Sequence, residues 1–251
     1  MINKEFSVGP NPDIDIHIQS GRVEIKSGNS NLVKVDVETE DSEFKVEQRG
    51  DQIYVSSGKG GGWSSRGSAY VSVEVPDDCD ATIASASAKV EIDSPVRHLE
   101  IKTASGDIEF ALANSANIKT ASGDARIGEV RGDIKVSSAS GDVNLGQSGG
   151  KVTFSSASGD ILIGENGGTI TASTASGDVT IERFFGRQLN VKSMSGEVEV
   201  GVPGGTGLDL DVTLMSGELH TPEPAAGPGP SGRQMTIKAK LVSGDLWINR
   251  I

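Results

Sequence analysis

A carboxylate recurs at one fixed position along the middle of the sequence, each time directly after a Ser-Gly pair. The copies are Asp107, Asp124, Asp142, Asp160 and Asp178. If they stack at the usual strand spacing of about 4.8 Å, two neighbours repel by about 0.9 kcal/mol in water and by about 3.5 kcal/mol at an effective dielectric of 20. Hydrogen bonds from turn amides can offset the smaller value, whereas the larger one would require a cation. We therefore interpret this Asp ladder as turn caps, with divalent-ion binding as the alternative.

Side chains that could carry out catalysis are few and scattered. His17, His98 and His220 belong to different parts of the sequence, and Cys79 lies outside any spacing that is typical of a metal or nucleophile site. We predict that the protein is not an enzyme and that it binds no cofactor. A nucleophile and a base brought together from distant segments stay open as an alternative.

The Asp ladder belongs to a repeat of about 18 residues. The glycines of the Ser-Gly pairs follow one another at spacings of 17 to 19 residues; they are Gly106, Gly123, Gly141, Gly159, Gly177 and Gly196. In the copy that starts at Ile134, apolar and polar residues alternate before and after the turn, which is typical of two half-buried strands. Gly141 suits the turn between them because it adopts positive φ without a steric penalty. One such coil cannot bury its own apolar face, so the coils must stack.

We predict an all-β fold: a single-stranded β-solenoid, in the form of a right-handed β-helix of about 18 residues per coil. A flattened coil also fits the alternation, and the number of sides, two or three, stays open. Left-handed hexapeptide helices place an aliphatic residue at every sixth position, and this chain does not. One Ser/Thr column shares the parity of the core residues, so we expect it to point inward and to bond to neighbouring coils. The column consists of Thr103, Thr120, Ser138, Ser156, Thr174 and Ser193.

Two domains are predicted. Residues 1–80 contain a first coil, at 14–25, and longer alternating strands that we interpret as an antiparallel β-meander capping the solenoid. Residues 81–251 form the repetitive solenoid, with a Pro/Gly insertion at 222–233. The last coil, around 237–248, then forms an end edge without a separate cap, and we expect end-to-end self-association there.

Composition excludes several partners. The 251 residues carry a net charge of −12. This charge argues against nucleic acid and anionic membrane surfaces as partners, because both bind basic patches. No apolar run approaches the length of a transmembrane segment, and the first residues lack the order of a secretory signal. We expect a cytoplasmic protein, and a surface location only if a leader precedes this sequence. Three residues are candidate interaction anchors: Trp63 and Arg66 in a Gly-rich loop, and Trp247 near the last coil.

The repeated Ser-Gly-Asp-Val/Ile-x-Ile turns, together with residues 18–25 and 73–76, resemble the bacterial putative-adhesin family of β-strand-repeat proteins of unknown function. The resemblance covers nearly the whole chain. It implies surface adhesion or an association with envelope stress, and no enzymatic activity. It supplies no catalytic residues. The chain departs from secreted or membrane-tethered members because no signal or transmembrane segment is seen.

The sequence therefore predicts a non-catalytic, adhesin-like interaction protein that presents an acidic, repetitive surface to a protein or cell-envelope partner. Two alternatives stay open. One is a self-assembling scaffold that resembles bactofilins and joins through its end edge. The other is a calcium-stabilised binding module that uses the Asp ladder.

Overall fold

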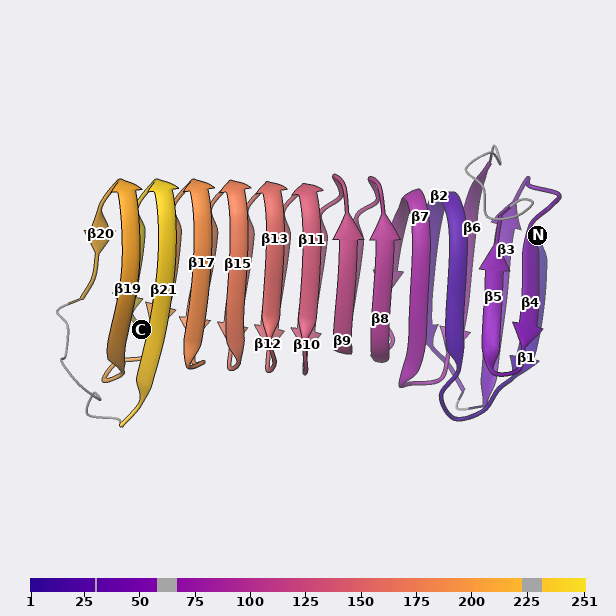
Figure 1. Ribbon diagram of the computed structural model, residues 1–251. Helices are drawn as coiled ribbons and strands as arrows, with labels where there is room; N and C mark the ends of the chain where they lie inside the picture. The colour runs from indigo at the N-terminus through magenta and orange to yellow at the C-terminus, as the bar shows by residue number, and fades with distance from the viewer. Residues whose placement is uncertain (30, 58–66, 223–231) are drawn as a thin grey trace. The chain divides into compact units, whose positions relative to one another are not determined.

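The computed structural model describes residues 1–29, 31–57, 67–222 and 232–251, and these form strands, turns and bends without a helix (Figure 1). The all-β prediction is confirmed. The chain divides into two compact units, Met1–Gly128 (unit 1) and Glu129–Ile251 (unit 2).

Unit 2 shows the repeat in its simplest form, because each rung gives one strand to each of two parallel ladders. The first ladder contains β11 (Ile134–Ser140), β13 (Val152–Ser158), β15 (Thr169–Ser176), β17 (Gln188–Ser195), β19 (Gly207–Ser216) and β21 (Gln234–Ser243). The second contains β12 (Val143–Ser148), β14 (Ile161–Asn166), β16 (Val179–Phe184), β18 (Val198–Val202), β20 (Leu219–His220) and β22 (Leu246–Arg250).

The core of unit 2 is a set of columns of identical or similar apolar residues. Val143 pairs with Ile161, Ile161 with Val179, and Val179 with Val198. All four side chains are at most 3% exposed. Each rung is therefore shielded by the rungs on either side of it, and the predicted stacking is confirmed in this unit.

The turn glycines allow the rungs to approach each other closely. Gly141, Gly159 and Gly177 have φ of +131°, +114° and +124°, as the turn prediction for Gly141 required. A Cβ at Gly177 would lie 2.3 Å from the carbonyl oxygen of Gly159 on the neighbouring rung. Glycine is needed here for backbone conformation and for inter-rung contact alike.

The rungs at the C-terminal end of unit 2 do not follow chain order, which corrects the sequence-based prediction. β21 pairs with β17 on one side and with β19 on the other, and β22 pairs with both β18 and β20. The outermost rung is therefore β19–β20, and the last coil of the chain lies inside it (Figure 1). Most of the predicted Pro/Gly insertion at 222–233 lies outside the described residues.

Unit 1 contains three long strands, β2 (Asp13–Ser27), β7 (Cys79–Ile92) and β9 (Ile108–Thr120), that each pair in both ladders, together with shorter strands. The shorter strands are β1 (Ile2–Ser7), β3 (Leu32–Thr39), β4 (Lys45–Arg49), β5 (Gln52–Ser56), β6 (Ser68–Val75), β8 (Val96–Thr103) and β10 (Ala125–Val130). β2 pairs with β7 in parallel, with Ile14 opposite Ala81 and Val23 opposite Val90. The predicted first coil at 14–25 is confirmed by this register.

The N-terminal segment forms antiparallel pairs, but not as a meander. β3 pairs with β6 and with β1, and β4 pairs with β5, all antiparallel. β5 and β6 then pair in parallel with the first and second halves of β2. The two halves of β2 belong to different ladders, so β5 joins one ladder and β6 joins the other. β3 pairs with β6, whereas a meander would place β3 beside β4.

Candidate binding grooves

The repeat places outward-facing side chains in columns, and two neighbouring columns border an open groove in each unit. In unit 2 one column is Ser137, Ser155, Ser173, Lys192 and Lys240, whose members are register partners on adjacent strands. The other column consists of exposed apolar side chains: Ala139, Ala157, Ala175, Met194 and Val242. The Ser/Thr column lies between them and forms the floor.

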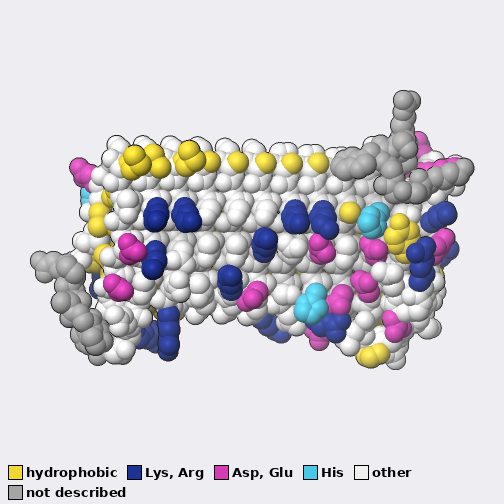
Figure 2. All heavy atoms as spheres, viewed as in Figure 1, with side chains coloured by type: hydrophobic (Ala, Val, Ile, Leu, Met, Phe, Trp, Pro, Cys, Tyr) yellow, Lys and Arg dark blue, Asp and Glu magenta, His cyan; other side chains and the backbone are white. Residues whose placement is uncertain are grey.

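The unit 2 groove has a volume of about 560 Å³ and crosses β11, β13, β15, β17 and β21. Its lining includes the serines of three successive rungs, Met194 and Lys240. Met194 is 62% exposed and Val242 is 44% exposed. Figure 2 shows hydrophobic side chains over β17 and β21 with basic side chains directly beside them.

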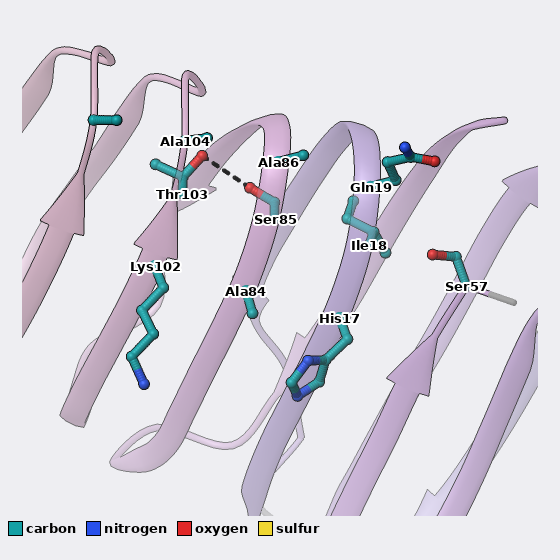
Figure 3. A pocket seen from close by; sticks show the side chains of 11 residues that line it. His17, Ile18, Gln19, Ser57, Ala84, Ser85, Ala86, Lys102, Thr103 and Ala104 are labelled. Atoms are coloured by element: carbon teal, nitrogen blue, oxygen red, sulfur yellow. Dashed lines mark hydrogen bonds between the residues drawn. The ribbon is translucent and has the colours of Figure 1, made fainter. Parts of the chain in front are cut away.

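Unit 1 has a groove of about 440 Å³ at the same position of the repeat. Lys102, Ala84 and His17 lie in one row across neighbouring strands, and Ser85 and Thr103 form the floor (Figure 3). Ser85 Oγ donates to Thr103 Oγ1 at 3.0 Å. Ordinary ligand pockets have volumes of roughly 300–1,000 Å³, so both grooves are large enough to hold a small molecule.

The floor hydroxyls bond mostly within their own turns, which differs from the expected bonding to neighbouring coils. Thr120 Oγ1 accepts from Gly123 N at 2.9 Å, and Thr174 Oγ1 donates to Ser176 O at 3.0 Å. Ser156 Oγ donates to Ser158 O at 2.9 Å. The Ser85–Thr103 bond does join two rungs. Ser138 Oγ and Ser193 Oγ have no hydrogen-bond partner among the described residues, and the surface of the unit 2 groove is mostly apolar.

The Asp ladder connects the turns of successive rungs. The backbone N–H of Asp160 donates to Asp142 Oδ1 at 2.9 Å, that of Asp178 to Asp160 Oδ1 at 2.9 Å, and that of Glu197 to Asp178 Oδ1 at 2.7 Å. In unit 1, Asp124 N donates to Asp107 Oδ1 at 3.2 Å. Each of these carboxylates caps an amide of the next rung, which offsets the repulsion between neighbours. Among the described residues, no group of three His, Cys, Asp or Glu side chains is placed to hold a metal ion.

A histidine and a serine from different strands do meet in unit 1. His98 Nδ1 lies 2.7 Å from Ser115 Oγ, and the two residues are register partners on β8 and β9. Both oxygens of the nearby Asp80 bond to the Arg97 guanidinium, which lowers the pKa of Asp80. The carboxylate is therefore engaged by arginine, and the His98–Ser115 contact is that of an ordinary exposed cross-strand pair.

Other ionisable groups in unit 1 are engaged in structural contacts. Glu24 is 8% exposed; it accepts from Tyr70 Oη at 2.6 Å and pairs with Lys26 Nζ at 2.6 Å. These contacts, that with Lys26 first, lower the pKa of Glu24. Burial raises the pKa of the Cys79 thiol to about 12, so the sulfur stays protonated at neutral pH.

The predicted interaction residues have different outcomes. Trp63 and Arg66 lie outside the described residues. Trp247 lies on β22, and its ring stacks on His220 of β20 with centroids 3.6 Å apart. This contact joins the last coil to the outermost rung. The role of Trp247 as an interaction anchor stays a prediction.

The sequence matches the Toastrack DUF4097 family over residues 11–249. The chain belongs to this family. Solved structures similar to this Toastrack chain include a putative adhesin from Bacteroides fragilis, 13% identical with a TM-score of 0.46, and a putative adhesin from Parabacteroides distasonis, 14% identical with a TM-score of 0.44. Each alignment covers 100% of this chain and 96% of the other. No curated protein matches the sequence. The resemblance to the adhesin family is confirmed.

Sequence reasoning on this Toastrack chain missed both grooves, although it contains a signal for them. Lys102, Lys119, Lys192 and Lys240 each stand four residues before a turn glycine, where three other repeats have serine. Aligning the repeats on that glycine would have placed Lys192 and Lys240 in one column, although only the order of the last rungs makes them direct neighbours. In the part of the chain that the structure describes, no helix could span a bilayer.

Proposed function

We propose that this chain is a non-catalytic, adhesin-like binding protein that holds a protein or cell-envelope partner against the outward columns of its repeats. The observation that carries this proposal is the recurrence of one groove at the same repeat position in both units. Membership of the Toastrack family over residues 11–249 is consistent with such a role. The carboxylates of the Asp ladder and Asp80 are engaged in structural bonds, which further favours binding over catalysis.

Retention of the purified chain on envelopes isolated from the native cell tests this proposal. Phe substitutions of Ala84 in unit 1 and Ser155 in unit 2 would fill the two grooves, since both residues line them. Thr153→Phe is the matched control, because Thr153 lies on the same strand and face as Ser155 but outside the groove lining. Retention should fall at least tenfold in the double variant and stay within twofold in the control. Equal retention of all three proteins would refute the role of the grooves.

A second candidate function, end-to-end self-association, is favoured by the outermost rung of unit 2. Leu210 and Val212 of β19 are partly exposed, whereas their register partners Ile237 and Ala239 are fully buried. Among the described residues, no strand pairs with the free edge of β19, and such an edge is a template for an identical strand of a second copy. Leu210→Lys should shift a concentration-dependent dimer to monomer in light scattering. A wild-type chain that stays monomeric at high concentration removes this candidate.

A further inference from the structure

We infer that the unit 2 groove binds a single acyl chain that ends in an anionic group. This inference rests on the proposed binding function and names the ligand class of one of its sites. The groove lies between the Ser/Lys column and the apolar column and has a volume of about 560 Å³. It crosses the strands of five rungs, so its length suits an extended chain.

The lining favours an acyl chain over a sugar or a peptide. Ser156 and Thr174 of the floor donate their hydroxyl hydrogens to backbone carbonyls, so these groups are not free donors for a sugar. No aromatic side chain is among the residues that line this groove. The strands beneath it pair on both sides within the ladder, so they offer no edge to a peptide. Met194 adds a flexible apolar wall, and methionine adapts its shape to apolar ligands.

The two lysines at one end of the groove supply the positive charge. Lys192 and Lys240 are register partners on the neighbouring strands β17 and β21, whose backbones are about 4.8 Å apart. Both side chains are exposed. Neither makes an ion pair with any described residue. Unit 1 has a corresponding pair of register partners, Lys102 and Lys119. That pair differs because Lys102 Nζ lies 2.8 Å from Glu100 Oε1, so one of its two charges is already matched. Two adjacent, unpaired ammonium groups in a chain of net charge −12 fit an anionic head group.

Ser193 provides a polar contact at the same end. The residue is 4% exposed and lines the groove on β17, directly after Lys192. Ser156 and Thr174, in the middle of the floor column, donate to the carbonyl two residues onward. Ser138 Oγ and Ser193 Oγ, at its two ends, have no hydrogen-bond partner among the described residues, and of these two only Ser193 is adjacent to Lys192. A buried hydroxyl without a partner is costly. A head group held by Lys192 and Lys240 would give it an acceptor.

Titration calorimetry of the full chain with monomeric sodium dodecanoate tests the inference. We expect saturable binding that weakens about 25-fold in the Lys192→Gln/Lys240→Gln variant, or about fivefold per lysine for a unit charge near 4 Å in water. Lys238→Gln is the matched control, because Lys238 is on the same strand and exposed but faces Asp211 and lies outside the groove lining. It should change the affinity less than twofold. Ser155→Phe should abolish binding, and circular dichroism checks that it folds.

Three results would overturn the inference: no saturable binding of dodecanoate, equal affinity for dodecyltrimethylammonium, or an equal loss in the Lys238→Gln control. Vesicles of anionic phospholipid form a separate arm, and binding to vesicles without binding of monomeric dodecanoate would also overturn it. The lysine variants keep the test decisive if Ser155→Phe does not fold. If dodecanoate fails while native envelopes still retain the chain, the proposed adhesin-like function stands and only this ligand assignment falls.

Discussion

Replacing Gly177 by alanine should destabilise unit 2 strongly, because the new Cβ would meet two separate obstacles. The backbone φ of +124° is a conformation that L-residues avoid, at a cost of about 1–3 kcal/mol. The Cβ would also lie 2.3 Å from Gly159 O, so the two rungs must separate by several tenths of an ångström. That movement strains two nearby inter-rung hydrogen bonds, from Asp178 N to Asp160 Oδ1 and from Ile161 N to Asp178 O, both 2.9 Å. At about 1 kcal/mol each, the total loss is about 3–5 kcal/mol.

Urea unfolding followed by far-UV circular dichroism measures this loss. With an m-value of about 3 kcal/mol/M, the midpoint should fall by about 1 M or more. Gly167→Ala is the control, because no atom lies within 4 Å of the place that its new methyl group would take and its φ is not in the left-handed region. We expect that variant within about 0.5 kcal/mol of wild type. If the two variants have the same midpoint, the claim that the rungs approach closely at the turn glycines is refuted.

Four further predictions follow from the described contacts. Asp160→Ala should lower the unfolding free energy by about 1 kcal/mol because Asp178 N loses its acceptor, whereas Asp160→Asn should keep it; equal losses in urea unfolding would contradict the capping role. Arg97 lowers the folded-state pKa of Asp80, so this pair stabilises the fold above the unfolded pKa of about 3.9, and the contribution is lost as the pH falls through the folded value. Asp80→Asn should therefore have a lower urea midpoint than wild type at pH 7, and the difference between the two midpoints should be smaller at pH 3. The same difference at both pH values would refute the assignment. Cys79 should resist a thiol reagent at pH 8 and react on unfolding, and rapid labelling of the native chain would contradict its burial. Because the Asp ladder is satisfied by amides, a chelator should leave the melting temperature unchanged within about 2 °C, and a larger fall would favour the calcium-stabilised alternative.

The rung itself was predictable from local pattern. The alternation around Val143 and the glycine at 141 determine two strands and a turn, and the regular spacing determines which residues become partners on the next rung. The Asp ladder was correctly interpreted as turn caps, although the amide that each carboxylate caps belongs to the neighbouring rung. Sequence spacing could not show this. A carboxylate that accepts from its own turn and one that accepts from the next rung would give the same repeat of Asp at the same spacing.

Long-range order was less predictable. Nothing in the local sequence of β19 and β21 determines which of them packs on β17, because both carry the same apolar register. The division of β5 and β6 between two ladders also depends on β2 being long enough to serve both. The grooves were missed for a related reason: they form between columns, so they become visible only when outward residues of several rungs are aligned together.

The order of the last rungs has a consequence for how the chain is made. A ribosome delivers β19 before β21, yet the final place of β19 exists only after β21 has docked on β17. During synthesis the nascent β19 can reach β17 directly and pair with it in the same apolar register. That non-native strand pairing has to break before β21 can take its place beside β17. Assembly of this end is therefore an insertion and not a simple addition, and its completion waits for the last strands to emerge.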